Sequence, residues 1–397
     1  DRNGLRPLRY TITSDDLFFA GSETGMIKIP EEKIIEKGKL GPGQIIAIDL
    51  KKGKLFKDKA IKDFLAKDYK KYNKQIIDLE KKISNENEKP NFIGEDLRKR
   101  QYLSGLSIED LELILHPMAE EGKEASGSMG DDTPVAVLSS HFRPVSHYFR
   151  QNFSQVTNPP IDSLRENKVM SLKTRFGNLG NILDFDNLTE ENIYVLDSPI
   201  LTNSQFKKFK KFFSKKTKVI DCTFDISLSL KNRIDAIREE AETSVREGST
   251  CIILSDKNIS NQKASIPSIL IVGAVHSHLV KHGLRGYCSL NIECSDALDT
   301  HSFAVLIGVG ATTVNPYLAI DSIYQRFEKK LFGKSDFESC VVKFKKSIDA
   351  GLLKIMSKMG ISVISSYRGG CNFEAVGLSR AIVSDYFPGM SSRISGI

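Results

Sequence analysis

The sequence predicts an α/β protein with parallel strands and crossover helices, preceded by a β-rich segment. Two observations carry this prediction. From about residue 217 onward, short apolar runs alternate with helical patterns, which is typical of parallel sheets whose strands are joined by helices. Residues 1–60 instead show short strand-like runs separated by glycines. A content of 40% hydrophobic and 27% charged residues fits a soluble chain that can bury a core.

The composition excludes several classes of protein. The length of 397 residues suggests two or three domains. No apolar run reaches the roughly 18 to 20 residues of a membrane span, since Pro267, His276 and His278 interrupt the longest one, 266–280. The six cysteines include no CxxC pair, which favours a reducing compartment. We therefore expect a cytoplasmic protein with no membrane partner.

The two ends of the sequence favour an interior piece of a longer chain. It opens without Met on DRNGLRPLRYTI and closes on SSRISGI without a polar tail. A natural domain usually has frayed polar ends, so further domains on both sides are expected.

The first half of the chain offers few strong patterns. Three strand-like runs come first: 9–13, 17–20 and 45–49. Ser107 opens the capping-box pattern Ser-Ile-Glu-Asp before the apolar run 111–115. We expect Pro117 to end that helix, because proline cannot donate a backbone hydrogen bond.

The second half is regular. The expected elements are, in order, a strand at 219–224, a helix at 234–245 ended by Gly248, a strand at 251–254, a helix from Ser265 and Pro267 to Gly283, a strand at 287–293, a helix at 299–307, a strand at 311–315, a helix at 317–327, a helix ended by Gly360, a strand at 361–364, and a helix from about Asn372.

The net charge of +7 lies in two lysine-rich tracts, 51–90 and 206–218. In the second tract, Phe206, Phe209 and Phe213 follow helical spacing, which predicts one apolar stripe on a surface helix. Neither tract carries a known nucleic-acid-binding signature. We therefore interpret both as solvated faces and expect no nucleic-acid partner.

Two glycine motifs have a functional and a structural interpretation. Asn3-Gly4 could form an oxyanion-binding pair, but Asn-Gly is also the commonest tight-turn dipeptide and no cysteine occurs in the first 221 residues. Gly308-Val309-Gly310 is half of a dinucleotide-binding loop, but Thr313 stands where a third glycine is needed. A turn and close helix-on-strand packing are favoured.

His276, His278 and His282 resemble a metal-binding cluster. On a helix, His278 and His282 share a face, whereas His276 points roughly 200° away from His278. A zinc site needs a third ligand, and no HExxH motif is present. Core or helix-end histidines are favoured, and no metal is expected. Cys288 and Cys294 are interpreted as small buried apolar groups.

Two further stretches are candidate sites. In 155–172, two prolines fix an extended backbone after Asn158, and Asp162 can cap a helix. Such a rigid polar loop suits the lining of a passage or the bracing of a domain interface, and both interpretations remain open. In 354–380, an anion could meet a helix start and an Arg-Gly-Gly turn. The candidate anion-binding residues are Lys354, Lys358, Arg368 and Gly369.

At these stretches the sequence resembles a known family. The long motifs, in family order, include HPMAEEGKEASGSMGDDTPVAVLS, FSQVTNPPIDSLRE, IGVGATTVNPYLA, GLLKIMSKMGISVISSYRGG and NFEAVGLSR. Together they resemble the large subunit of glutamate synthase, most of all its bacterial NADPH-dependent type. The likeness covers nearly the whole chain, and only the tract near 51–90 and residues 184–260 match loosely.

The resemblance implies a domain organisation. Residues 1–80 would be the C-terminal part of an N-terminal-nucleophile glutaminase domain, which explains the β-rich start. Residues 81–397 would be the central domain, with an irregular and helical part at 81–216 and an α/β part at 217–397. The catalytic cysteine and its oxyanion motif would lie upstream, so Asn3-Gly4 does not inherit that role.

The resemblance also implies an enzyme, which forms glutamate from glutamine and 2-oxoglutarate. FMN and a 3Fe–4S cluster would lie in other parts of the large subunit, and FAD, 4Fe–4S clusters and NADPH would come through the small (beta) subunit. The expected partners are therefore the chain's own glutaminase and FMN synthase domains and that small subunit, in an oligomer of alpha–beta units. We expect this segment alone to hold no cofactor and to be inactive.

The family carries ammonia through an internal tunnel, and the segment would contribute to its geometry. Ammonia that reaches bulk water becomes ammonium, so a tunnel must be dry and uncharged. We expect Thr157, Asn158, Pro159 and Pro160 near this path, because they form the most rigid neutral loop. Two other functions stay open: a free-standing α/β phosphate-site enzyme, and a basic binding module whose affinity falls with salt.

Overall fold

The computed structural model describes residues 7–67, 76–83, 87–125, 136–137, 139–140, 142–153, 160–176, 192–370 and 372–396. The chain divides into two compact units, Asp1–Lys74 and Gln75–Ile397. Each unit is described by itself.

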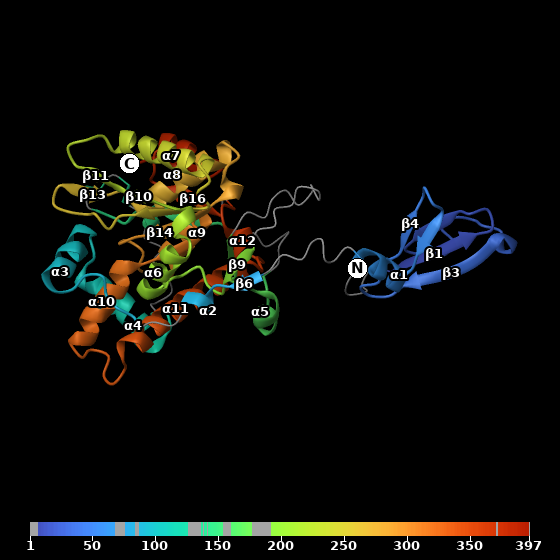
Figure 1. The fold of residues 1–397 in the computed structure, drawn as a ribbon, viewed down its shortest axis with the longest axis horizontal. Helices are drawn as coiled ribbons and strands as arrows, with labels where there is room; N and C mark the ends of the chain where they lie inside the picture. The colour runs from blue at the N-terminus through green and yellow to red at the C-terminus, as the bar shows by residue number, and fades with distance from the viewer. Residues whose placement is uncertain are drawn as a thin grey trace. The chain divides into compact units, whose positions relative to one another are not determined.

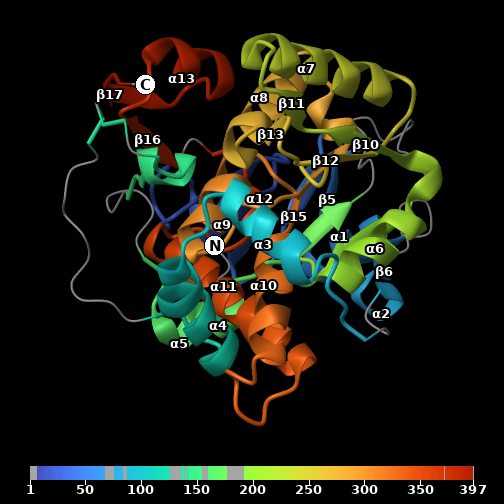
Figure 2. The same cartoon turned by 90° about the vertical axis from the view of Figure 1, so that its left-hand side faces the viewer.

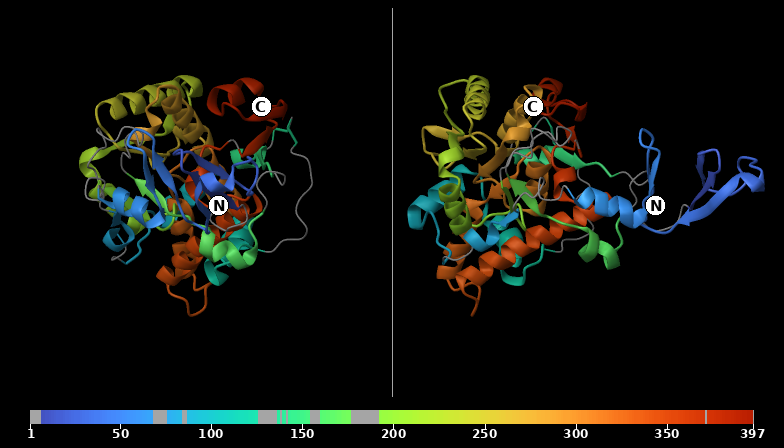
Figure 3. Two further views of the ribbon diagram at one scale, coloured as in Figure 1. Left: turned by 90° about the vertical axis from the view of Figure 1, so that its right-hand side faces the viewer. Right: turned by 45° about the vertical axis from the view of Figure 1, so that its right-hand side comes forward.

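The first unit is β-rich, as the sequence predicts. Its elements are β1 (Leu8–Thr13), β2 (Phe18–Gly21), the 3₁₀ turn η1 (Glu31–Lys33), β3 (Ile34–Leu40), β4 (Ala47–Asp49), β5 (Lys54–Phe56) and α1 (Asp58–Ala66). β1 pairs antiparallel with both β2 and β3, and β4 with β5 (Figure 3, blue arrows). Among the described residues of this unit, only Thr13 and Ile61 are buried. The described part therefore lacks a hydrophobic core of its own.

The second unit is built on a four-stranded parallel sheet with the order β10-β12-β14-β15. Its strands and connecting helices alternate along the chain: β10 (Thr217–Asp221), α7 (Leu230–Arg246), β12 (Cys251–Ser255), α8 (Ser268–Lys281), β14 (Ser289–Glu293), α9 (Thr300–Gly308), β15 (Thr313–Asn315) and α10 (Tyr317–Glu328). Figures 1 and 2 show α7 and α8 side by side over the sheet. The prediction of an α/β domain with parallel strands and crossover helices is confirmed.

Both faces of this sheet are covered, which is why its strands are apolar throughout. Ile252 and Leu254 of β12 belong to the main core, together with residues of α7 and α8. Cys251 and Ile253 point to the other face and pack with Phe206 and other residues in a second core. A parallel strand that is buried on both faces has a continuous apolar sequence. This pattern made the strand at 251–254 predictable.

Helix α6 (Asn203–Phe212) supplies the second core. Phe206 and Phe209 are buried, while Lys207 between them is exposed and Lys208 is half-buried. The predicted apolar stripe is confirmed. Thr202 caps the helix, and the Gln205 side chain accepts a hydrogen bond from the Thr202 backbone N–H, which completes a capping box.

Smaller sheets and helices surround the central layer. Three sheets have the orders β11-β13, β17-β16-β7 and β6-β9-β8. Their strands are β6 (Ile76–Asp78), β7 (Phe149–Gln151), β8 (Thr174–Phe176), β9 (Ile193–Leu196), β11 (Thr223–Asp225), β13 (Lys263–Ser265), β16 (Phe373–Val376) and β17 (Ser391–Ile394). The remaining helices are α2 (Glu80–Ile83), α3 (Gly94–Leu103), α4 (His116–Glu121), α5 (Ser163–Val169), α11 (Phe337–Lys358), α12 (Ile364–Tyr367) and α13 (Arg380–Tyr386). Short 3₁₀ turns are η4 (Val145–Tyr148), η5 (Ser214–Lys216) and η6 (Arg285–Tyr287).

In the part of the chain that the structure describes, no helix combines the length and apolar character needed to cross a membrane.

Glycines end several helices as predicted. Gly248, Gly283 and Gly360 have φ angles of 98°, 69° and 68°, which only glycine adopts without strain. Gly308 ends α9, and a Cβ atom there would lie 2.3 Å from the Phe373 ring on β16. The close packing of helix on strand that the sequence favours at this glycine is confirmed.

Four details of the sequence-based prediction are wrong. The expected strand 219–224 is two strands, β10 and β11, because the chain leaves the parallel sheet at Cys222 and pairs antiparallel with β13. Pro117 does not end its helix. It lies in the first turn of α4, directly after the π-helical turn Asp110–Leu115. Its missing N–H therefore removes no regular α-helical hydrogen bond, and Gly122 ends the helix instead.

The other two errors lie near the C-terminus. The expected strand 361–364 makes a single bridge, from Val363 to Ser171, and the short helix α12 begins at Ile364. The expected helix after Asn372 is the strand β16, which pairs with β7 and β17 on its two sides. Both errors have one cause: the pairing partners of these residues lie far away in the sequence.

Candidate functional site at the carboxyl edge of the central sheet

The carboxyl ends of the parallel strands lead into a cluster of buried polar side chains. In open α/β sheets this edge is where ligands usually bind. Asp256 follows β12, and Glu293 is the last residue of β14, with Asp296 three residues on. A cavity of about 210 Å³ lies beside them, and its polar lining residues include Asp110, His147, Ser265, Ser268, Ser295 and Asp296.

Glu293 forms two ion pairs in this cluster. Its side chain is only 2% exposed, and its two carboxylate oxygens lie 2.7 Å from Lys257 Nζ and 2.9 Å from Lys210 Nζ. Ser255 Oγ donates a third hydrogen bond at 2.8 Å. Burial alone would raise the pKa of Glu293, but the two ammonium groups hold that pKa below its ordinary value. This carboxylate therefore ties α6 to the ends of β12 and β14.

Asp256 is buried and Asp296 is partly buried, and the pKa values of both carboxyls are raised. Ser295 donates to Asp256 through its backbone N–H at 2.9 Å and its hydroxyl at 2.7 Å. Burial and the neighbouring Asp296 raise the pKa of Asp256 to about 6. Asp296 accepts from the Ser268 N–H at the start of α8, 3.0 Å away, and burial raises its pKa as well. The Oδ1 atom of each carboxyl has no hydrogen-bond partner.

Asp321 of α10 joins three separate segments. Its carboxylate accepts hydrogen bonds from the backbone N–H groups of Asn91 and Phe92, at 2.9 and 3.0 Å, and from Asn203 Nδ2, at 2.8 Å. Burial raises the pKa of Asp321 to about 7 despite these donors. One side chain therefore fixes the segment before α3 and the start of α6 against α10.

Burial shifts the pKa values of several groups near this cavity. Burial raises the pKa of the Cys294 thiol well above its ordinary value, so this cysteine is not a nucleophile at neutral pH. His147 lines the cavity, and burial lowers its pKa. Among the described lining residues, no hydroxyl or thiol is hydrogen-bonded to a histidine side chain, although such a pair is the usual sign of an activated nucleophile.

The loop predicted to line a passage is only partly described. Thr157, Asn158 and Pro159 lie outside the described residues, and Pro160 is exposed. Directly after it, the Ile161 N–H donates to Ser357 O of α11 at 2.8 Å. Asp162 caps α5 by accepting from the Arg165 N–H, as the sequence predicts.

The predicted anion-binding residues lie on different elements: Lys354 and Lys358 on α11, and Arg368 and Gly369 directly after α12. Lys354 and Lys358 are exposed on α11, whereas Arg368 is partly buried and donates from Nε to Ala311 O at 3.0 Å. Gly369, with φ 67°, donates its N–H to Gly308 O. Since residues 373–376 form a strand, the argument from a helix start no longer applies. Gly369 lies against the His276 ring, and the charge of Arg368 lowers the pKa of that histidine.

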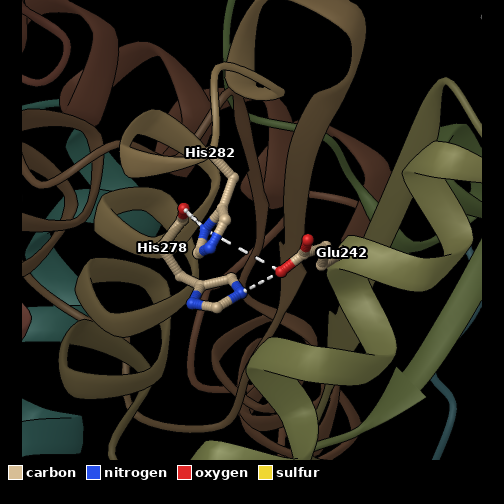
Figure 4. A group of neighbouring side chains, drawn as sticks. All are labelled: Glu242, His278 and His282. Atoms are coloured by element: carbon tan, nitrogen blue, oxygen red, sulfur yellow. Dashed lines mark hydrogen bonds and ion pairs between the residues drawn. The ribbon is translucent and has the colours of Figure 1, made fainter.

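His278 and His282 share a face of α8, as predicted, and their ring centroids are 4.3 Å apart. Figure 4 shows Glu242 of α7 pointing toward both rings, with its Oε2 atom 2.7 Å from His278 Nε2 and 3.8 Å from His282 Nδ1. These three side chains could together hold a metal ion. Each already has a protein partner, because Arg246 binds Glu242 at 2.8 Å and His282 Nδ1 donates to the His278 carbonyl. The absence of a metal stays a prediction.

Asp349 of α11 gives a pH-dependent prediction. It accepts from Ser198 Oγ at 2.7 Å, and burial raises its pKa to about 6. A carboxyl whose folded pKa is raised contributes stability that is complete below pH ~4 and is lost as the pH rises through about 6. Between pH 4 and 7 the unfolding free energy of the wild type should therefore fall by about 2 kcal/mol relative to Asp349→Asn.

Urea unfolding at several pH values measures this difference. Glu338→Gln, which changes an exposed carboxylate on the same helix, is the matched control and should run parallel to the wild type. If the Asp349→Asn profile also runs parallel, Asp349 does not take up a proton on folding.

Fold and site together define a multidomain protein: an α/β domain braced by buried carboxylates, joined to a β-rich unit. The family model described as glutamate synthase central domain matches residues 99–379, more than half of the chain. A second model, for class-II glutamine amidotransferases, matches residues 1–74. The chain belongs to the glutamate synthase family.

Relatives of known function match this chain over its whole length. The large chain of the NADPH glutamate synthase of Azospirillum brasilense is 55% identical over 405 residues, which cover all of this chain and 27% of the relative. That of Bacillus subtilis is 40% identical and is covered to 26%, and a ferredoxin-dependent glutamate synthase of Synechocystis is 38% identical and also covered to 26%. The chain thus spans about a quarter of the length of these relatives.

The flavin-binding domain of baker's yeast flavocytochrome b2 aligns in structure over 71% of this chain and 91% of that domain, at 11% sequence identity. The TM-score of 0.37 is too low to support a conclusion.

Proposed function

We propose that this chain is the part of a glutamate synthase large subunit that joins its glutaminase domain to its FMN synthase domain. The complete enzyme would make glutamate from glutamine and 2-oxoglutarate, with NADPH as electron donor. One observation carries the proposal: the 55% identity to an NADPH glutamate synthase large chain extends over the whole sequence, across both family models.

In this proposal, residues 1–80 complete a glutaminase domain and residues 81–397 form the central domain, in two parts at 81–216 and 217–397. The sparse burial in the first unit supports the assignment, because a sheet with two buried residues in its described part needs further chain to form a core. The amidotransferase match to residues 1–74 fits the same assignment.

The segment acts as a scaffold and holds no cofactor in this proposal. FMN and the 3Fe–4S cluster belong to other parts of the subunit, and FAD, 4Fe–4S clusters and NADPH to a small subunit, in a cytoplasmic alpha–beta oligomer. The five described cysteines are all buried. The side-chain group close enough to hold a metal, among the described residues, contains no cysteine, so it does not suit an iron–sulfur cluster. The buried carboxylates serve internal contacts, which suits a structural role.

In this proposal the ammonia path runs along Thr157, Asn158, Pro159 and Pro160. The support is indirect: the chain after Pro160 is fixed by the bond from Ile161 to α11 and by the Asp162 cap. A loop held at one end and made of neutral residues suits the wall of a passage that must exclude water.

A charged side chain in this loop should uncouple the two reactions of the complete enzyme. In Thr157→Lys, we expect glutamine hydrolysis to exceed glutamate formation, because an ammonium group in the passage admits water and converts ammonia to ammonium. The measurement is the ratio of glutamine consumed to 2-oxoglutarate converted. Leu164→Lys places the same charge on an 86% exposed position of α5 and should keep the ratio at one. A one-to-one ratio in Thr157→Lys would show that the loop does not line the path.

A further inference from the structure

Two partly buried arginines lie close together at the amino edge of the central sheet, opposite the carboxylate cluster. Arg285 lies in the turn η6 before β14 and uses all three of its nitrogens. Nε donates to His276 Nδ1 at 3.0 Å, and Nη1 to Cys288 O at 2.6 Å. Nη2 donates to Gly310 O at 2.9 Å and to Thr312 Oγ1 at 3.2 Å. Each of these acceptors is electrically neutral.

Arg368 is the second guanidinium. Its Nε donates to Ala311 O, next to the carbonyl that Arg285 binds. Its Nη2 atom is buried and has no hydrogen-bond partner. Burial and the charge of Arg285 lower the pKa of Arg368 to about 10, so the group is still charged at neutral pH. An unpaired nitrogen on a buried cation is costly.

The histidine between them does not offset the charge. Burial, Arg285 and Arg368 together lower the pKa of His276 to about 4, so the ring is neutral at pH 7 and its Nδ1 can accept from Arg285. In the described part of the chain, no carboxylate pairs with Arg285 or Arg368. Two partly buried positive charges with no counter-ion among the described residues are unfavourable, which favours an anion as their partner.

A cavity of about 340 Å³ opens beside these groups. Its polar lining residues are Arg175, Thr250, Arg285, Ser289, Thr312 and Arg368, and no acidic residue is found among the described lining residues. Arg175 comes from β8 and is exposed, so it stands at the accessible side. Three guanidinium groups with hydroxyl donors are the usual chemistry for an oxyanion.

We propose that this cavity is an anion-binding site that takes a carboxylate or phosphate-type oxyanion between Arg175, Arg285 and Arg368. The site shares no residue with the proposed ammonia path, and the inference does not depend on the proposed function of the segment. Two sources supply the same chemistry. One is a free small anion, and the other is an acidic side chain from another part of the longer polypeptide.

A crystal structure of the complete enzyme soaked in selenate distinguishes the two sources, because selenium scatters anomalously. Selenate in the cavity identifies a free anion, whereas a carboxylate side chain seated there identifies the polypeptide as the source. Either result supports the site. A cavity that contains neither, with the arginines still facing it, overturns the proposal.

Thermal unfolding of the complete enzyme provides the solution test. For a free anion, inorganic phosphate should raise the midpoint more than chloride at equal ionic strength, and Arg175→Gln should weaken apparent phosphate binding by at least about tenfold. For a seated carboxylate, Arg175→Gln should lower the midpoint in the absence of added anion. The control is Arg165→Gln, which removes a 74% exposed arginine paired with Asp162 and should change neither result. The proposal is contradicted if Arg175→Gln and Arg165→Gln show the same apparent phosphate binding and the same unfolding midpoint without added anion.

Discussion

Glu293→Gln is expected to lower the free energy of unfolding by about 3 to 5 kcal/mol. The substitution keeps the shape of the side chain but removes the negative charge between Lys210 and Lys257. These two lysines are then left close together, with 31% and 27% of their side chains exposed. Because they partly reach solvent, the lower end of the range is expected. Urea unfolding followed by circular dichroism measures the loss.

The control for this prediction is a surface ion pair on the same domain. Glu240 lies 3.0 Å from Lys218, with side-chain exposures of 36% and 42%. Glu240→Gln should cost no more than about 1 kcal/mol, since exposed pairs contribute little. Equal losses in the two variants would mean that Glu293 is not the point at which α6 is fixed to the sheet.

Gly310→Ala is expected to cost about 2 to 5 kcal/mol, for two separate reasons. Gly310 has a φ of 129°, where any other residue is strained. A Cβ atom there would also lie 2.3 Å from Cγ of His276, so the ring must move. Moving His276 also breaks its bond with Arg285, which links this prediction to the arginine cavity.

Gly248→Ala separates the two causes. Gly248 has a φ of 98°, and a Cβ atom there would have no neighbour within 4 Å. This variant therefore reports backbone strain alone, and we expect a loss of about 1 to 2 kcal/mol. If Gly310→Ala lowers the free energy of unfolding no more than Gly248→Ala does, the contact between a Cβ at position 310 and His276 is not tight.

The alternating architecture was predictable because its signals are local. The strand at 251–254 is a continuous apolar run. Gly248, Gly283 and Gly360 indicate helix ends without reference to any distant part of the chain. The errors occur where pairing is distant. β16 needs β7, which precedes it by more than half of the second unit, and nothing near Phe373 indicates that partner.

The candidate site was mostly missed for the same reason. Asp321 binds Asn91 and Phe92, 230 and 229 residues away. Glu242, which completes the group with the two histidines, lies on the preceding helix, 36 residues before His278. One usable signal was present: Asp256 and Glu293 stand at the ends of two runs predicted as parallel strands, so their clustering at one edge could have been expected.

The strand order also has a consequence for folding during synthesis. In β10-β12-β14-β15 each strand pairs with the parallel strand made before it, so this sheet can assemble as the chain leaves the ribosome. β7 has no such neighbour. Its partner β16 is translated long after it, so closing that loop is a late and entropically costly step. A nascent chain stopped before Phe373 would hold a finished parallel layer and an unpaired β7 edge, which is the part that a chaperone must protect.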